Sequence, residues 1–460
     1  MSAPTAAVIA ALPDGRADAC IETHISWVLL AGDFAFKIKK SLTLPFLDYG
    51  TVEKRRACCD AELRLNRRFA PDLYLSVVEL AGEPAVKMRR FDEALRLDHV
   101  CQRGGLTTEH LSQLAQTLVL FQARAAVSLA PTFYGAPQTI LADALENFDE
   151  LFKLLPAEQA RLAALEGWTR QEFSARESTF AARQAAGRIR EGHGDLHLGN
   201  LVLLEGRVVP FDGIEFNEGF RCIDVASEIA FTLLDLLDHR QPGLATWLLS
   251  EWLMYSGDFA SLAVLRFYLV YRAMVRAKVA AIRQDAAEAA GYLYFAEQLA
   301  AQRAPTLTIT CGPSGSGKTY ASSCRLASAD FLDTVRIRSD VERKRLFGLA
   351  PAAASDGSIY TPEATVRTYA QLAVLAETAV TTGWSVIVDA AFLKRAERDE
   401  FHALAIRLGV PFRILAPHAP LDEMARRIAA RQNDASEATV AILKQQLQWF
   451  EPLGADEPAS

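Results

Sequence analysis

The chain contains 460 residues, of which 50% are hydrophobic and 23% are charged, and its formal net charge at pH 7 is −7. This composition excludes a disordered or fibrous chain, and the length exceeds what one hydrophobic core can organise, so we expect several globular domains. The acidic balance excludes a global basic field for a nucleic-acid backbone, although a local basic groove is compatible with it.

The cysteines and the apolar segments predict a cytoplasmic protein. The seven cysteines are scattered, without a paired disulfide framework or a CxxC spacing, which is typical of reduced thiols. The longest apolar runs, 226–237 and 261–275, are interrupted by charged residues, and no basic residue precedes the short apolar patch at 1–12. We therefore expect neither a membrane span nor a signal peptide.

The first 90 residues predict a small sheet with one helix. Residues 25–40 form two β-rich runs around the turn Ala31-Gly32-Asp33, which indicates a hairpin. Residues 51–69 have helix-forming composition, and 74–90 are again β-like. The predicted order is strand, strand, helix, strand.

Two helical blocks follow this sheet. Residues 106–185 and 222–302 are rich in alanine and leucine and carry charges at helical spacing. Between them, residues 193–212 read as a loop with a short hairpin. A loop held between helices is a common place for catalytic side chains.

This loop contains the sequence HGDLHLGN at 193–200, followed by Asp212 at the end of an apolar run. Asp195 precedes Asn200 by five positions, and Asp212 follows Asn200 by twelve, which is the kinase-type pattern of a base and two metal ligands. Asp195 can accept the proton of an attacking hydroxyl, while Asn200 and Asp212 hold Mg²⁺ against the phosphates of ATP. His193 is expected to brace the loop, because no third ligand is spaced for a zinc site.

The motif resembles that of the aminoglycoside phosphotransferase and choline kinase branch of the protein-kinase-like superfamily. This resemblance implies a two-lobe fold, with Lys37 contacting the α- and β-phosphates of ATP and Glu62 as its helix partner. Lys39 lies on the same strand face and is the alternative lysine. The resemblance also implies that Asp224 is a buried brace of the catalytic loop. No glycine-rich loop precedes Lys37, and Leu198 stands where many relatives carry proline.

A domain boundary is predicted near residue 304, which gives domains 1–303 and 304–460. After it, four short apolar runs alternate with helical segments, a pattern that predicts a parallel α/β sheet. The predicted strands are 307–311, 335–337, 384–388 and 412–415.

The rear domain opens on Gly312-Pro313-Ser314-Gly315-Ser316-Gly317-Lys318-Thr319, which fits G-x-x-x-x-G-K-[ST] between a strand and a helix. In this motif the backbone N–H groups surround phosphates, Lys318 reaches the terminal phosphates and Thr319 ligates Mg²⁺. Asp389 ends a predicted strand and is a second candidate for the Mg²⁺ side, with a capping role as the alternative. The residues expected to contact the nucleotide are Gly312, Ser314, Gly315, Ser316, Gly317, Lys318 and Thr319.

Two further segments favour a kinase over a motor or a GTPase. Arg338-Ser339-Asp340 resembles the acceptor-side element of the polynucleotide kinase, gluconate kinase and zeta-toxin group, which implies that Asp340 orients or deprotonates the accepting hydroxyl. Arg427 and Arg431 fall where that group carries its lid, and mobile arginines there could neutralise charge on the transferred phosphoryl group. For all three residues the alternative interpretation is solvated surface charge.

The whole arrangement resembles a bacterial aminoglycoside phosphotransferase-like domain fused to an AAA_33-type P-loop kinase domain. It predicts a phosphotransferase that uses ATP and Mg²⁺ in two modules to phosphorylate hydroxyl groups of small molecules. One alternative is a single catalytic module with a nucleotide-sensing partner. A 5′-hydroxyl polynucleotide kinase is the other alternative, and it is not favoured, although a local basic channel is conceivable. Its residues would be Arg336, Arg338, Arg343, Lys344 and Arg345.

Overall fold

A computed structural model describes residues 4–44, 47–129, 132–301, 303–355, 357–430 and 435–458. The chain separates into two compact units, of which the first comprises Met1–Lys153 with Arg170–Asp235 and the second comprises Leu154–Thr169 with Leu236–Ser460. The boundary predicted near residue 304 lies inside the second unit, so the assignment of domains 1–303 and 304–460 stays a prediction. Within the described ranges, no helix is both long and apolar enough to cross a bilayer.

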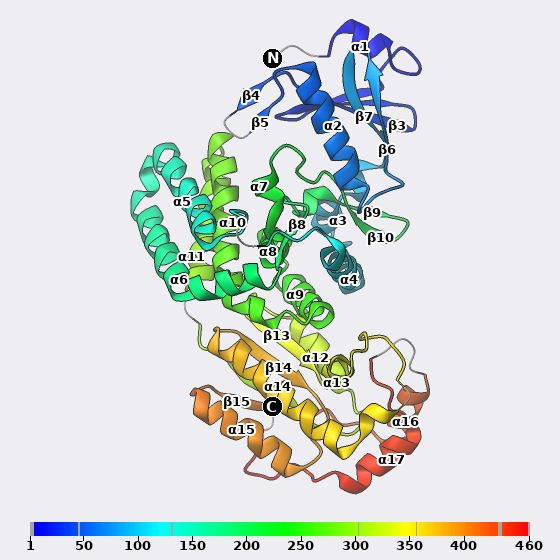
Figure 1. Cartoon of the computed structure of the whole chain (residues 1–460). Coiled ribbons are helices and arrows are strands. Elements are labelled where there is room, and N and C mark those ends of the chain that lie inside the picture. Colours follow the sequence, from blue (N-terminus) through cyan, green and yellow to red (C-terminus); the bar gives the residue numbers. More distant parts are fainter. Residues whose placement is uncertain are drawn as a thin grey trace. The chain divides into compact units, whose positions relative to one another are not determined.

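The first unit opens with a five-stranded antiparallel sheet in the order β1–β2–β3–β7–β6 (Figure 1). The hairpin predicted at 25–40 is confirmed as β2 and β3, with Gly32 in the turn at a φ of 55°. The stretch 74–90 is itself a hairpin, because Ala81 and Gly82 both adopt positive φ between β6 and β7. Gly82 is a turn signal of the same kind as Gly32, and the prediction of a single β-like stretch at 74–90 overlooked it. The strands are β1 (Ala19–Glu22), β2 (Ser26–Ala31), β3 (Phe34–Lys39), β6 (Tyr74–Leu80) and β7 (Glu83–Arg89), and a separate pair is β4 (Thr43–Leu44) with β5 (Leu47–Asp48).

Strand β3 is buried on both faces, which explains its unusual sequence FAFKIK. Phe36 and Ile38 pack into an apolar cluster with residues of helix α1 (Ala6–Ala10). The intervening Lys37 and Lys39 must point to the opposite face, because side chains alternate along a strand. That face carries helix α2 (Val52–Asn66), which packs against β6 and β7.

The remainder of the first unit is largely helical, as predicted, and four short strands hold the catalytic-loop segment. Strand β8 pairs with β11, and β9 pairs with β10, so that residues 192–200 and 211–221 connect two small ladders. The strands are β8 (Ile189–Glu191), β9 (Leu201–Leu204), β10 (Arg207–Pro210) and β11 (Cys222–Asp224). The helices are η1 (Glu93–Leu95), α3 (Leu97–Gln102), α4 (Thr108–Arg124), α5 (Pro137–Leu154), η2 (Pro156–Glu158), α6 (Gln159–Ala185), η3 (Leu198–Asn200), α7 (Glu218–Arg221) and α8 (Val225–Asp238), of which α5, α6 and α8 extend across the limits of the units and η2 lies in the second.

The second unit contains a parallel four-stranded sheet in the order β13–β14–β12–β15, which confirms the predicted α/β alternation. Helices α14 and α15 pack against each other and against the sheet, and α12 contacts β13, β14 and β15 (Figure 1). The strands are β12 (Leu307–Thr310), β13 (Thr334–Arg338), β14 (Ser385–Asp389) and β15 (Phe412–Leu415). The helices are α12 (Lys318–Ala327), α13 (Ser339–Leu346), η5 (Ser358–Tyr360), α14 (Pro362–Thr381), α15 (Arg395–Leu408), α16 (Leu421–Ala429) and α17 (Val440–Trp449).

Helices from before residue 304 complete the core of this unit. They are α9 (Pro242–Ser256), η4 (Phe259–Ser261), α10 (Leu262–Ile282) and α11 (Ala286–Ala300). Helix α9 contacts both α12 and the edge strand β13. The indole N–H of the fully buried Trp384 donates to the carbonyl oxygen of Leu262 over 3.1 Å, and Arg266 donates to the carbonyl oxygen of Gly383. The parallel sheet therefore shares its core with helices that precede it in the chain.

Candidate active sites

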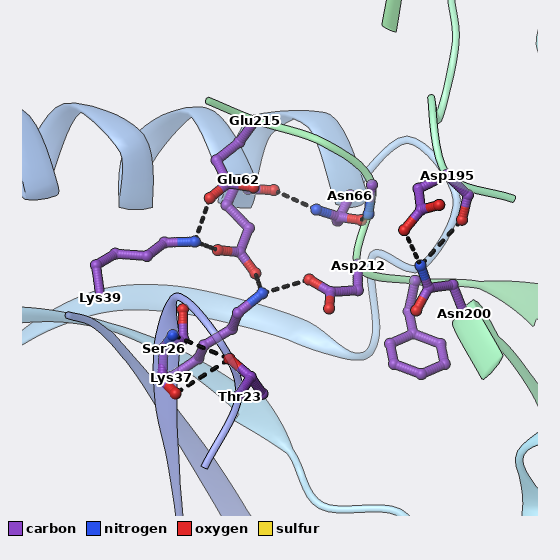
Figure 2. Close-up of polar contacts among 12 residues, drawn as sticks. Thr23, Ser26, Lys37, Lys39, Glu62, Asn66, Asp195, Asn200, Asp212 and Glu215 are labelled. Carbon is purple, nitrogen blue, oxygen red and sulfur yellow. Dashed lines mark hydrogen bonds and ion pairs between the residues drawn. The ribbon is translucent and has the colours of Figure 1, made fainter. Parts of the chain in front are cut away.

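A buried network of charges lies on the α2 face of the front sheet (Figure 2). The ammonium group of Lys37 lies 2.9 Å from Oε1 of Glu62 and also contacts the carboxylate of Asp212. Lys37 and Glu62 are both buried, whereas the side chain of Asp212 is 40% exposed. The structure thus brings together a strand lysine, a helix glutamate and a loop aspartate that are far apart in sequence.

Lys39 takes part in a second branch of the same network that the sequence did not reveal. Its ammonium group contacts the other oxygen of Glu62 and the carboxylate of Glu215, which also accepts a hydrogen bond from the hydroxyl of Tyr49. The side chains of Lys39 and Glu62 are fully buried and that of Glu215 is 3% exposed. Glu62 therefore contacts both lysines. Lys37 also pairs with Asp212, and Lys39 also pairs with Glu215.

Mutual attraction keeps these groups charged. Burial by itself lowers the pKa of Lys37 and Lys39, but the neighbouring carboxylates outweigh it and raise both pKa values above the usual lysine range. Burial raises the pKa of Asp212 and Glu215, and the lysines reverse this and hold both pKa values below the usual range. Three carboxylates face two ammonium groups, so the network carries an excess of negative charge.

The loop at 193–200 brings Asp195 and Asn200 together, as the motif predicts. The amide of Asn200 donates to the backbone oxygen of Asp195 over 2.9 Å and to its carboxylate over 3.1 Å (Figure 2). The side chain of Asp195 is 36% exposed, and Nε2 of His197 lies 3.5 Å from its carboxylate. A partly exposed carboxylate, oriented by an amide, has the access that a general base requires.

Hydrogen bonds to buried side chains fix the conformation of this loop. Nε2 of His193 is 2.8 Å from the carbonyl oxygen of Phe211, and the pKa of the imidazole is lowered by burial, as expected for a neutral bracing residue. The backbone N–H of Leu198 donates to Asp235 over 2.7 Å, and the backbone N–H of His193 donates to Glu228. Both carboxylates lie on α8, 37 positions after Leu198 and 35 positions after His193, so no local sequence pattern points to them.

Asp224, which the resemblance implied to be a brace, is buried and forms a bidentate ion pair with Arg183 through two contacts of 2.7 Å. One of its oxygens also accepts the backbone N–H of Ala226. These contacts tie helix α6 to the start of α8, and the role of Asp224 as a brace of the catalytic loop stays a prediction.

Asp212 is held in a strained backbone conformation. Its φ is 62°, which is uncommon for a residue other than glycine, and such strain persists only where surrounding contacts enforce it. Its backbone N–H donates to the hydroxyl of Tyr74 over 2.9 Å, and the next N–H, of Gly213, donates to the side-chain oxygen of Asn66 over 2.8 Å. The front sheet and α2 thus fix the position of the Asp212 carboxylate.

A pocket of about 640 Å³ adjoins this site. The ring of Phe91 packs edge-on against that of Phe211, the neighbour of Asp212, with centroids 5.1 Å apart. The pocket is lined by Leu30, Asp33, Arg89, Arg90, Phe91, Asp92 and Glu93.

In the second unit, the predicted P-loop connects β12 to α12. Gly312, Gly315 and Gly317 all have positive φ, and a Cβ atom on Gly315 would lie 2.6 Å from the backbone oxygen of Met424. Only glycine fits such positions. Helix α12 begins at Lys318, whose ammonium group donates to the carbonyl oxygens of Gly312 and Pro313 over 2.7 and 2.8 Å.

The hydroxyl of Ser316 and the carboxylate of Asp389 mark the interior of this site. Ser316 is 3% exposed, and its hydroxyl has no hydrogen-bond partner among the described residues. Asp389 ends β14, is 5% exposed, and lies 3.2 Å from the hydroxyl of Ser322, which in turn lies 3.0 Å from the backbone oxygen of Thr319. Thr319 and Asp389, the two predicted Mg²⁺ ligands, are therefore linked through one buried serine.

The acceptor-side residues occupy two places. Arg338 pairs in register with Asp389, so Asp340 follows β13 at the same carboxyl edge of the sheet. Asp340 is close enough to Arg343 to oppose the lowering of the arginine pKa that burial causes. Arg427 donates to the backbone oxygen of Gly315 over 3.2 Å, which brings it to the P-loop. Arg431 lies outside the described residues.

A family model, known proteins and solved structures match different parts of the chain. The family model AAA_33, described as an AAA domain, matches residues 307–453. The Uncharacterized protein Rv2004c of Mycobacterium tuberculosis (strain ATCC 25618 / H37Rv) is 30% identical over 449 residues, which cover 92% of this chain and 88% of that relative. A protein from Mycobacterium bovis, Mb2027c, matches with the same values.

Solved structures also match the front part. The GDP and kanamycin complex of APH(2")-IIia is 14% identical, covers 64% of this chain and 96% of its own, and has a TM-score of 0.41. Choline kinase from Cryptosporidium parvum is 11% identical, covers 61% and 88% of the two chains, and has a TM-score of 0.42. At these scores the likeness decides nothing by itself, and the assignment depends on the sheet order and the charge network.

A five-stranded sheet with a buried lysine–glutamate pair, joined to a helical part with an Asp–Asn loop and a second aspartate, is the protein-kinase-like fold. The parallel sheet with a glycine-rich loop before α12 is the P-loop NTPase fold. Together they define a nucleotide-binding protein that combines these two folds. The chain belongs to the same family as the mycobacterial proteins Rv2004c and Mb2027c.

Proposed function

We propose that this protein is an ATP-dependent phosphotransferase in which both modules transfer the γ-phosphoryl group of ATP to hydroxyl groups of small-molecule acceptors. The observation that carries the proposal is the joint contact of Lys37 with Glu62 and Asp212, beside the Asp195–Asn200 pair. These are the five positions that a kinase needs for phosphate contact, metal binding and proton removal.

The charge balance of the front network favours a divalent cation. Its three carboxylates exceed its two lysines, and Asp212 is the carboxylate with solvent access. Asp212 and the amide oxygen of Asn200 are hard oxygen ligands of the kind Mg²⁺ prefers, and bound Mg²⁺ would neutralise charge on the ATP phosphates. Lys37 would exchange part of its contact with Asp212 for the phosphates.

The turn between β1 and β2 is the segment that we propose covers the triphosphate. Ser26 pairs in register with Lys39, so its side chain lies on the same sheet face as the two lysines. Its residue is fully buried, and its hydroxyl has no hydrogen-bond partner among the described residues. An orphaned hydroxyl in this place is a donor that a phosphate oxygen would satisfy, in a turn that lacks glycine.

At the front site, the acceptor hydroxyl would lose its proton to Asp195 as its oxygen attacks the γ-phosphorus. The bond from that phosphorus to the β-phosphate oxygen breaks, and ADP leaves. Asn200 holds the Asp195 carboxylate in place, and His193, Glu228 and Asp235 keep the loop rigid.

At the rear site, the same transfer would be supported by different groups. The unpartnered Ser316 hydroxyl and the glycine backbone fit a phosphate, and Thr319 with Asp389 would hold Mg²⁺. We propose that Lys318 and Arg427 stabilise charge on the transferred group, that Arg431 joins them, and that Asp340 orients the acceptor.

Among the described residues of this unit, three of the five basic residues that could line a channel are buried. Arg336, Arg343 and Lys344 are 4%, 8% and 1% exposed, and each contacts a carboxylate or a backbone oxygen. Buried and engaged cations cannot follow a phosphate backbone, so a small acceptor is the better proposal.

The test is ADP release from purified full-length protein with ATP and Mg²⁺ across sugars, amino alcohols, aminoglycosides and 5′-hydroxyl oligonucleotides. Loss of a general base reduces turnover by about 10²- to 10⁴-fold, so Asp195→Ala should lower the front activity by that factor. Lys318→Ala removes a group that stabilises charge on the phosphates and should abolish the rear activity. Lys153→Ala, whose side chain is 69% exposed, is the control and should change neither.

Stimulation by an acceptor that only one variant abolishes would assign that acceptor to one module. If only one variant ever has an effect, the other module is a nucleotide-sensing domain. If no acceptor stimulates turnover while both sites still bind ATP, the phosphotransferase proposal is wrong.

A further inference from the structure

A buried polar chain leads from helix α9 to the candidate metal side of the rear site. It begins at Glu251 on α9, whose carboxylate lies 3.3 Å from the guanidinium of Arg336 on β13. The same guanidinium donates to the hydroxyl of Ser322 over 3.2 Å and to that of Ser323 over 2.7 Å. Arg336 therefore joins an element from outside the 307–453 match to the helix that follows the P-loop.

Ser322 passes this connection on to Asp389. Its hydroxyl accepts from Arg336 and lies 3.2 Å from Oδ2 of Asp389 and 3.0 Å from the backbone oxygen of Thr319. A hydroxyl has one proton, so Ser322 donates either to the carboxylate or to the carbonyl oxygen at any moment. The other oxygen of Asp389 lies 3.4 Å from the hydroxyl of Thr310.

The groups of this polar chain are buried, which strengthens the electrostatic attraction between them. Arg336, Glu251 and Asp389 are 4%, 6% and 5% exposed, and Ser322 is fully buried. Burial lowers the pKa of Arg336, and Asp389 and Glu251 both act against that shift, so the arginine is attracted to both carboxylates. The position of the guanidinium is set by competition between Glu251 on one side and Asp389 on the other.

Helix α9 is held against β13 and α12 by several contacts, which fix the position of Glu251. The hydroxyl of Ser250 accepts the backbone N–H of Arg336 over 3.2 Å, and the guanidinium lies 5.5 Å from the ring centroid of Trp247. Gly243 allows α9 to approach α12 so closely that a Cβ atom there would lie 1.9 Å from the backbone oxygen of Ala327. Figure 1 shows α9 alongside α12 and β13.

We propose that Glu251 and Arg336 are positioning residues of the rear site, which act through Ser322 to keep the Asp389 carboxylate oriented for Mg²⁺. Glu251 holds the guanidinium back from Asp389. Without the charge of Glu251, the attraction of Arg336 to Asp389 is no longer opposed by Glu251, and the arginine competes with the metal for the Asp389 carboxylate. This inference rests on the proposed nucleotide and Mg²⁺ binding of the rear site.

The experiment measures Mg²⁺-dependent ATP binding and basal ADP release of the full-length protein as Mg²⁺ is titrated. The rear signal is defined as the part that Lys318→Ala removes. Loss of a partner that orients a metal ligand typically costs 10- to 100-fold in metal affinity, so Glu251→Gln should raise the half-saturating Mg²⁺ concentration about 10-fold. At saturating Mg²⁺ the rate should return towards that of the wild type.

Two variants protect the test against a folding defect. Ser322→Ala removes the connecting hydroxyl with little change in volume and should shift the Mg²⁺ requirement in the same direction. Glu377→Gln breaks an exposed glutamate–arginine pair of the same unit, with Arg407 at 3.2 Å, and should leave the Mg²⁺ requirement unchanged. Thermal unfolding without nucleotide reports separately on stability.

The outcomes separate the two proposals. If Lys318→Ala removes no signal, the rear site does not bind nucleotide and the proposed function fails. If Lys318→Ala removes the signal but Glu251→Gln and Ser322→Ala change the half-saturating Mg²⁺ less than twofold, the positioning role is wrong. A loss of rate that excess Mg²⁺ does not restore would also contradict it.

Discussion

Replacement of Gly243 by alanine should stabilise helix α9 locally but destabilise its packing against α12. Gly243 lies in the first turn of α9, directly after Pro242. Helix propensity alone favours alanine over glycine by up to about 1 kcal/mol in a helix. A Cβ atom at this position, however, would lie 1.9 Å from the backbone oxygen of Ala327 and 2.7 Å from its carbonyl carbon.

The size of the clash follows from the identity of the neighbour. A backbone carbonyl cannot rotate away as a side chain can, so α9 would have to move relative to α12. Overpacking of this kind costs about 1 to 3 kcal/mol, and occasionally more, which exceeds the gain in propensity. We expect Gly243→Ala to lower the free energy of unfolding by about 1 to 3 kcal/mol, which for a unit of this size lowers Tm by about 2 to 12 °C.

Thermal and urea unfolding of the full-length protein measure this change, together with the temperature at which ATP binding dependent on Lys318 is lost. The matched control is Gly291→Ala in α11, where no atom lies within 4 Å of the added Cβ. That variant should be more stable than the wild type by up to about 1 kcal/mol. A Gly243→Ala protein that is as stable as the wild type would refute the close packing of α9 on α12.

Two further predictions concern the front network. Lys39→Met removes one partner of a buried ion pair and leaves Glu215 without it, so unfolding in urea should show a loss of about 3 to 5 kcal/mol. Lys54→Met, at an exposed pair with Asp48, is the control and should leave the free energy of unfolding nearly unchanged. A loss below 1 kcal/mol at Lys39 would contradict the network. Because the pKa values of Asp212 and Glu215 are lowered in the folded protein, their contribution to stability is present above their unfolded pKa of about 4 and is lost as the pH falls below it. The raised lysine pKa values act in the opposite direction, with stability present below about pH 10 and lost only at higher pH. The free energy of unfolding, measured from pH 3 to 8, should therefore decline on the acid side, and Glu215→Gln should make that decline shallower. A Glu215→Gln curve parallel to that of the wild type would contradict this assignment.

The catalytic-loop motif and the P-loop motif could be recognised in the sequence because each is a short pattern whose chemistry depends on local spacing. Asp195 and Asn200 lie five positions apart in one loop, and the structure places the amide nitrogen of Asn200 3.1 Å from the carboxylate of Asp195. The glycines of the P-loop signal their positive φ values in the same direct way. Strand β3 also revealed its alternation, which set Lys37 and Lys39 on one face.

The sequence does not distinguish Lys37 from Lys39 as the lysine that contacts phosphate, because both lie on one strand face and their partners come from distant segments. The fold assigns Asp212 to Lys37 and Glu215 to Lys39, pairs that are 175 and 176 positions apart. The sequence pattern predicts one β-like stretch at 74–90, whereas the structure has a hairpin there. Gly82 marks its turn in the sequence, but the positive φ of Ala81 depends on the sheet around it.

Two motifs typical of phosphate binding can be recognised from the sequence alone, because the spacing of side chains along the chain and the freedom of glycine are local properties. The distant charges around these motifs depend on the tertiary structure: Glu215 and Asp235 at the front site, and Glu251 and Arg336 at the rear. Burying a charge is costly unless an oppositely charged or hydrogen-bonding group contacts it. Which group makes that contact depends on how helices and strands that are far apart in the sequence pack together.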